Sequence, residues 1–182
     1  MMPDQPPNIQ WVSAWSVGRL CRLRWPLPAH IKEVHLLTGR RVHHWTMLLD
    51  QGEEPKPAED ISGYCQAYRN FGYQFSPSFT HIEHDFDNGQ WHGIVDRVGE
   101  IRGKKTVLEI KNGQPQPFHQ VQLAFYTQGL FPQSFLKIQR LAVYLANDGT
   151  YKARVYKDPR DYLTVKELLA LAEKEHHGTR HT

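Results

Sequence analysis

Two carboxylates and a lysine lie in two neighbouring apolar segments of the chain. Asp96 ends one apolar run, and Glu109-Ile110-Lys111 lies in the next. Because side chains alternate along a strand, Glu109 and Lys111 are expected on the same face of that strand. The turn between the two segments is short, so antiparallel pairing would bring Asp96 close to Glu109. The pattern therefore predicts two acids and a lysine in one patch of a sheet.

Such a patch suits metal-dependent chemistry. Two close carboxylates repel each other, and one takes up a proton unless a cation neutralises the pair. Carboxylate oxygens are ligands that Mg²⁺ or Mn²⁺ prefers, and either ion can polarise a phosphoryl oxygen and lower the pKa of bound water. Lys111 could position that water or stabilise transition-state charge. The tripeptide alone does not distinguish this site from an ordinary Glu–Lys pair on a half-exposed strand, which is the commoner case.

The order of the motifs favours the metal site. Gly93-x-x-Asp96, Glu109-x-Lys111 and Gln122-x-x-x-Tyr126 together resemble the PD-(D/E)XK nuclease superfamily, and more narrowly its RecB-like, phage-type exonuclease group. The resemblance spans about 39–126. At an i, i+4 spacing, Gln122 and Tyr126 share one helical face. The resemblance implies that this face looks towards the metal and the DNA backbone. His119, one turn earlier, is then a candidate DNA contact.

The resemblance also implies two further metal ligands. In this group a glycine is often followed by a helical histidine that completes the metal shell, and Gly39 and His43 fit that pattern. We favour His43 over His44, although a helical histidine is more often structural. The main-chain carbonyl of Ile110 is implied as a ligand beside Asp96 and Glu109. A nitrogen ligand shifts the preference towards Mn²⁺.

Several other side chains are candidates for supporting roles. Arg40 and Arg41 lie one turn from His43 and could contact phosphates. Trp45 and Tyr73 could stack on unpaired bases, although core packing is the favoured role of both. Glu83 could bind a second ion or orient the lysine, but a solvent-facing strand position is favoured.

The periodicity of apolar residues predicts a mixed α/β fold. Apolar spacing changes from helical to alternating after Gly72, and Asn88-Gly89 is a strong hairpin signal. The expected elements are helices at 13–25, 39–49, 58–71, 117–129 and from about 159–161 onwards, with strands at 79–86, 91–98, 105–111, 137–146 and 151–156. This order predicts a central mixed β-sheet flanked by helices. The resemblance to the nuclease superfamily implies the αβββαβ core of restriction-endonuclease-like folds.

Composition narrows the class of protein. The length of 182 residues predicts a single domain at 11–175. The net charge of +3 makes the chain mildly basic. A disordered lead-in at 1–10, unlike a secretory signal, and a disordered tail at 176–182 are expected to flank it. Cys21 and Cys65 predict buried reduced thiols and exclude a four-cysteine iron–sulfur cluster. The chain has no P-loop motif for a nucleotide and no apolar run of about 18 residues for a membrane span.

These observations converge on a metal-dependent deoxyribonuclease. An exonuclease acting on single-stranded DNA or DNA ends in recombination, repair or phage DNA processing is expected, in the cytoplasm of a bacterial or phage-infected cell. A structure-specific endonuclease on the same fold remains an alternative. So does a nucleic-acid-binding module that does not cut. The sequence specifies no oligomeric state.

Overall fold

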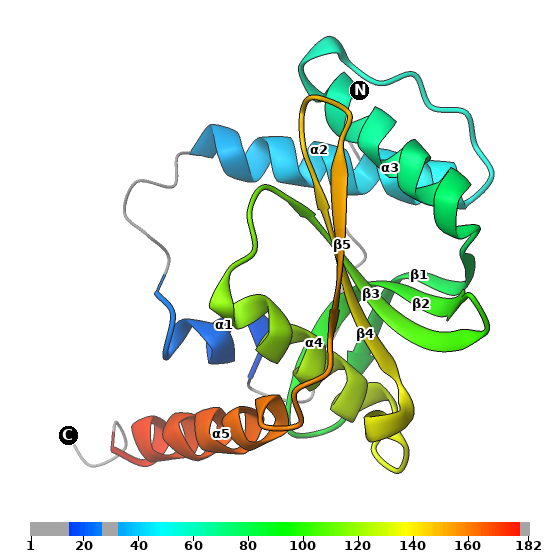
Figure 1. The fold of residues 1–182 in the computed structure, drawn as a ribbon. Helices are drawn as coiled ribbons and strands as arrows, with labels where there is room; N and C mark the ends of the chain where they lie inside the picture. The colour runs from blue at the N-terminus through cyan, green and yellow to red at the C-terminus, as the bar shows by residue number, and fades with distance from the viewer. Residues whose placement is uncertain (1–14, 27–32, 179–182) are drawn as a thin grey trace.

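The computed structural model describes residues 15–26 and 33–178 of the chain. It is an α/β structure in which helices cover both faces of a five-stranded mixed sheet, and the predicted fold class is confirmed (Figure 1). The elements are α1 Val17–Arg22, α2 Glu33–Asp50, η1 Glu59–Ile61, α3 Ser62–Phe75, β1 Ser78–Asp87, β2 His92–Ile101, β3 Lys104–Asn112, α4 Pro117–Leu130, η2 Phe135–Lys137, β4 Gln139–Leu145, β5 Tyr151–Tyr156 and α5 Asp161–Gly178.

The strands follow one another across the sheet in the order β1-β2-β3-β4-β5. Three of the four neighbouring pairs are antiparallel, while β3 and β4 run parallel. A parallel pair needs a crossover connection, and α4 supplies it. This places α4 directly against the strand that carries Glu109 and Lys111.

Each face of the sheet has its own apolar core. Helices α1, α4 and α5 cover one face, and α2 and α3 cover the other (Figure 1). The alternation along β3 decides the division: Val107 packs on the α4 side, whereas Leu108 and Ile110 pack on the α2–α3 side. Glu109 and Lys111 alternate with Leu108 and Ile110, so they belong to the α4 side.

Several element bounds differ from those predicted. Helix α1 is shorter than 13–25, because the Ser16 side chain accepts a hydrogen bond from the Arg19 N–H and caps the helix there. Helix α2 already begins at Glu33, and the helix predicted at 58–71 starts as the 3-10 turn η1 and continues to Phe75. Helix α5 runs into the expected tail and ends at Gly178. The expected lead-in, residues 1–10, lies outside the described residues.

Both cysteines are free and buried, as predicted. Burial raises the pKa of the Cys21 thiol to about 12 and that of Cys65 to about 11. Across the part of the chain that the structure describes, no helix combines the length and apolarity of a membrane span.

Helix α4 begins at a reciprocal cap built on His119. The Gln116 N–H donates to His119 Nδ1 over 3.2 Å, and the Gln116 side chain accepts from the His119 backbone. His119 is only 5% exposed, and its Nδ1 also lies 3.0 Å from the Tyr144 hydroxyl. Burial, followed by the charge of Lys111, lowers the pKa of His119 from 6.5 to about 3. The imidazole is therefore a neutral acceptor that fixes the start of α4.

This cap predicts an acid-sensitive contribution to stability. Because the folded pKa lies below the unfolded one, the unfolded chain binds the proton first, so the contribution is complete above pH 6.5 and is lost as the pH falls towards 3. Between pH 7 and pH 5, the free energy of unfolding of the wild type should fall by about 2 kcal/mol more than that of His119→Gln, which keeps an acceptor but does not titrate. Urea unfolding of both proteins at both pH values measures this difference. If the wild type and His119→Gln lost the same unfolding free energy between pH 7 and pH 5, the prediction would be contradicted.

Candidate metal centre

The candidate site lies where the pairing of β2 with β3 ends. The two strands pair from Ile101↔Lys104 up to Arg97↔Leu108. At the next position, Asp96 Oδ2 accepts a hydrogen bond from the Ile110 N–H over 2.6 Å. A side-chain carboxylate thus takes the place of a ladder partner. In a strand, the N–H and C=O of one residue point the same way, so the Ile110 carbonyl also faces this side of β3.

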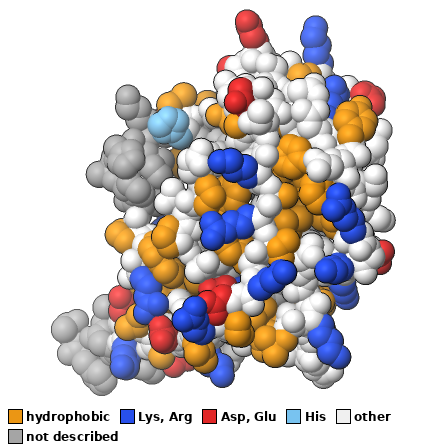
Figure 2. All heavy atoms as spheres, viewed as in Figure 1, with side chains coloured by type: hydrophobic (Ala, Val, Ile, Leu, Met, Phe, Trp, Pro, Cys, Tyr) orange, Lys and Arg blue, Asp and Glu red, His pale blue; other side chains and the backbone are white. Residues whose placement is uncertain are grey.

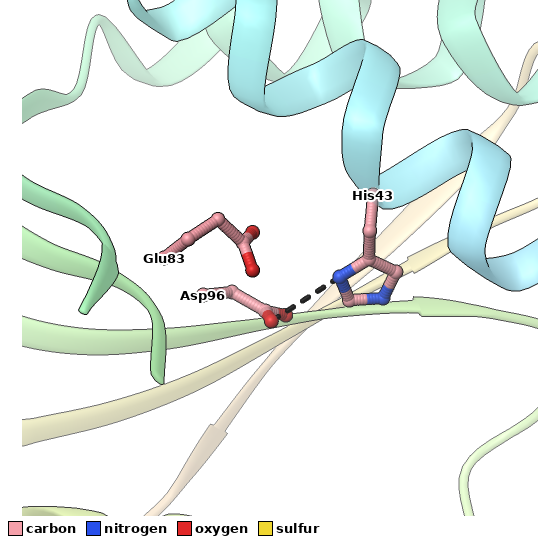
Figure 3. A group of neighbouring side chains, drawn as sticks. All are labelled: His43, Glu83 and Asp96. Carbon is pink, nitrogen blue, oxygen red and sulfur yellow. Dashed lines mark ion pairs between the residues drawn. The ribbon is translucent and has the colours of Figure 1, made fainter. Parts of the chain in front are cut away.

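Three side chains from three elements form a compact cluster (Figure 3). His43 comes from α2, Glu83 from β1 and Asp96 from β2, and their ligand atoms all lie within 4.8 Å of one another. His43 Nδ1 lies 3.2 Å from Asp96 Oδ1, so His43 rather than its exposed neighbour His44 faces the acid.

Glycines let the neighbouring elements approach this site. A Cβ at Gly39, one turn before His43, would lie 3.2 Å from the Asn112 side chain at the end of β3. A Cβ at Gly93 would lie 3.0 Å from the Tyr126 ring. The motif glycines thus mark close approaches of α2 and α4 to the strands.

Glu83 belongs to the cluster, and the favoured prediction of a solvent-facing residue was wrong. Ile82 pairs with Arg97 and His84 with Val95, which places Glu83 opposite Asp96. The Glu83 backbone has a φ of 48°, a left-handed conformation that costs a non-glycine residue about 1–3 kcal/mol. Regular alternation does not predict such a residue, and for this reason the sequence pattern gave no sign of where its carboxylate points.

The second half of the site is organised around Glu109, which is 3% exposed. Its Oε1 accepts hydrogen bonds from Lys111 Nζ at 2.8 Å and from Gln122 Nε2 at 2.9 Å. Gln122 Nε2 also lies 2.9 Å from the Tyr126 hydroxyl oxygen. The predicted helical face of α4 thus meets the predicted strand acid. The other oxygen, Glu109 Oε2, is buried without a hydrogen-bond partner.

The charges in the site shift one another's pKa values. Burial opposes the ionisation of Asp96, but His43, Lys111 and the Ile110 N–H together hold its pKa below the ordinary value. Burial, followed by the charge of Asp96, raises the pKa of Glu109 to about 7, against the opposing effect of Lys111. The site therefore carries one firmly ionised acid beside one that holds its charge weakly.

A buried arginine, Arg97, forms hydrogen bonds with residues that carry or adjoin the site, and the sequence pattern did not identify it as a site residue. Arg97 is 0% exposed, and its guanidinium donates to Asp50 at 2.5 Å and to Glu83 at 2.8 Å. It also donates to Thr46 Oγ1, which in turn donates to the His43 carbonyl. Arg97 is thus bonded to the elements that carry His43 and Glu83. The available signal in the sequence was an arginine directly after Asp96 and before Val98, inside the predicted strand 91–98.

Of the three expected DNA contacts, Arg41 and His119 need correction. Arg40 lines an open groove of about 530 Å³ together with His43 and Glu83, but Arg41 points away and forms a two-bond pair with Asp60. His119 is buried in the cap of α4, so it is not placed to contact DNA.

The two aromatic candidates for base stacking differ in their burial. Trp45 is 4% exposed and donates to the Pro55 carbonyl, as a core residue does. Tyr73 is 81% exposed, so its expected core role was wrong.

No protein-family model matches the chain, and no curated protein matches it significantly. Among solved structures, one titled "Crystal structure of SSO0001" matches at a TM-score of 0.38 and 20% identity, covering 86% of this chain and 81% of that one. At this TM-score the likeness has no bearing on the site.

The residues present fit a divalent cation. The predicted ligand set was His43, Asp96, Glu109 and the Ile110 carbonyl, whereas the compact cluster is His43, Glu83 and Asp96. Asp96 belongs to both ligand sets. Its Oδ1 faces His43, and its Oδ2 accepts a hydrogen bond from the N–H of Ile110, the residue after Glu109. Carboxylate oxygens and one imidazole can bind a divalent cation, and the unpartnered Glu109 Oε2 is the kind of buried atom that a cation would satisfy.

Replacing Arg97 with methionine should destabilise the fold by about 3 kcal/mol, because Asp50 and Glu83 would lose their buried partner. Arg160→Met is the matched control: Arg160 pairs with Asp158 while 82% exposed, and its loss should leave the free energy of unfolding almost unchanged. Urea unfolding of both variants measures this. If both variants lost the same small amount of unfolding free energy, Arg97 would not be needed to stabilise the residues around the site.

Proposed function

We propose that this protein hydrolyses phosphodiester bonds of DNA with a divalent metal ion, Mg²⁺ or Mn²⁺. The observation that carries the proposal is Glu109. One of its oxygens is fixed by Lys111 and Gln122, and the other is buried without a hydrogen-bond partner. The charge of Asp96, a member of the His43–Glu83–Asp96 cluster, acts on Glu109 and raises its pKa. The resemblance to RecB-like nucleases supports DNA as the substrate.

Asp96, His43 and Glu83 would hold the cation, and Glu109 would join them through Oε2. When bound, the ion polarises a phosphoryl oxygen and lowers the pKa of bound water. The residues of the chain supply the rest. Lys111 has three N–H donors and uses one on Glu109, so two remain for a phosphate oxygen or the attacking water.

Gln122 and Tyr126 act through Glu109. The Gln122 amide donates to Glu109 and contacts the Tyr126 hydroxyl, which fixes the carboxylate at one angle. Fixing the ligands in advance lowers the cost of reaching the transition state. Arg40, which lines the groove beside His43, would bind the neighbouring phosphate.

An exonuclease acting on DNA ends is our first choice, on the strength of the Gln122-x-x-x-Tyr126 helix. A structure-specific endonuclease on the same fold is the alternative. We place the activity in the cytoplasm of a bacterial or phage-infected cell, where thiols such as Cys21 and Cys65 stay reduced.

The test incubates the full chain with end-labelled linear and closed circular DNA, single- and double-stranded, with Mg²⁺, Mn²⁺ or EDTA. We expect cutting of linear DNA that requires the metal. Lys111→Ala should lower the rate at least about 100-fold, whereas Lys166→Ala, an exposed lysine on α5, should leave it unchanged. Cutting that persists in EDTA, or full activity of Lys111→Ala, would refute the proposal. Cutting of closed circles would make the protein an endonuclease.

A further inference from the structure

A second groove lies at the other end of β3 from the candidate metal centre. It has a volume of about 410 Å³ and is bounded by the β2–β3 turn, the start of β4 and the end of β5. Five cationic residues line it, and no acidic side chain does: Lys104, Lys105, Lys137, Arg140 and Lys157. In Figure 2, blue Lys and Arg side chains are interspersed with orange apolar ones on the face that carries β5.

Four of these five cations have no anionic partner among the residues that the structure describes. Arg140 is buried and donates to Asp161 at 2.8 Å, so its charge is neutralised within the fold. Lys105 Nζ lies 4.1 Å from the centre of the Phe131 ring, a cation–π contact that leaves its charge in place. The other three lysines are exposed, and no ion pair to any described residue engages them.

The strand register brings these lysines together. Thr106 pairs with Gln139, and Arg140 pairs with Tyr156, which places Lys157 opposite Gln139. Lys105 near the start of β3, Lys137 just before β4 and Lys157 just after β5 therefore lie at the same edge of the sheet. Neighbouring strands lie about 4.8 Å apart, so the row spans roughly 10 Å. Like charges at this spacing repel, and a bound polyanion would relieve that repulsion.

The groove also offers an apolar surface between the lysines. Ile138 and Tyr156 line it with little exposure, while Leu136 is 69% and Val155 40% exposed. Separate lysines around an apolar floor suit an extended anion better than one small ion at a single point. A phosphodiester chain has this form, with regularly spaced charges and apolar sugar faces between them.

We propose that this groove, the lysine groove, binds the phosphodiester backbone of a nucleic acid away from the point of cutting. The choice of nucleic acid as the occupant rests on the proposed function. Along β3, Lys105 and Lys111 are six residues apart, or about 20 Å at 3.3 Å per residue. That distance equals about six base-pair steps of 3.4 Å. The lysine groove would hold a part of the chain that the metal centre does not touch.

The test compares two variants that lose equal charge. The groove variant carries Lys104→Gln, Lys105→Gln, Lys137→Gln and Lys157→Gln; the control carries Lys56→Gln, Lys152→Gln, Lys166→Gln and Lys174→Gln, all at exposed lysines outside the groove. Binding to labelled single- and double-stranded 20-mers is measured by fluorescence anisotropy in EDTA at several salt concentrations. Circular dichroism checks that both variants fold.

The groove variant should bind at least 10-fold more weakly at 150 mM salt. The slope of log K against log salt should become shallower by about 3, since each lost phosphate contact removes 0.7–0.9. The control should change the slope by less than 1. Equal behaviour of the two variants would overturn the proposal. So would a groove variant that loses affinity for a polyglutamate peptide but keeps that for DNA, because the partner would then be an acidic protein segment. Binding in EDTA needs no cutting, so this result is independent of the nuclease assay.

Discussion

The burial of two neighbouring carboxylates is the constraint on which the rest of the site depends. Asp96 is 5% and Glu109 3% exposed, and ionised carboxylates at such positions are unstable unless cations or hydrogen-bond donors surround them. The chain supplies His43 and Lys111 for this purpose, together with a backbone N–H where the β2–β3 ladder ends. One carboxylate oxygen, Glu109 Oε2, is still left without a partner.

The fold answers this constraint from both faces of the sheet. On the α4 side, Gln122 and Lys111 hold Glu109, so the crossover helix that β3 and β4 require also orients the site. On the α2 side, the guanidinium of Arg97 joins Asp50 to Glu83 and leads through Thr46 to the backbone of His43. The strained backbone of Glu83 fits this arrangement, because the ion pair offsets part of its cost. The charged side chains that stabilise this part of the fold are thus the same ones that form the candidate site.

The sequence predicted the residues that local rules control and missed those that depend on tertiary contacts. Alternation along β3 correctly placed Glu109 with Lys111, and the i, i+4 spacing on α4 correctly placed Gln122 with Tyr126. That these two pairs face each other was an expectation from the family resemblance, and the hydrogen bond from Gln122 to Glu109 agrees with it. Glu83 was misplaced because its left-handed φ breaks the alternation on which the prediction relied.

The roles of three other residues depended on partners that lie far along the chain. Arg41 turns towards Asp60, and His119 is buried at a helix cap against Tyr144. Arg97 acts through residues of α2 and β1 that no spacing rule connects.

The central claim is that the charged side chains around Asp96 and Glu109 surround a divalent cation. A crystal soaked in Mn²⁺ tests this claim most directly. Its anomalous map should show a peak about 2.0–2.2 Å from an Asp96 oxygen, within reach of His43 and Glu109 Oε2. A map without a peak at Asp96 would contradict the account.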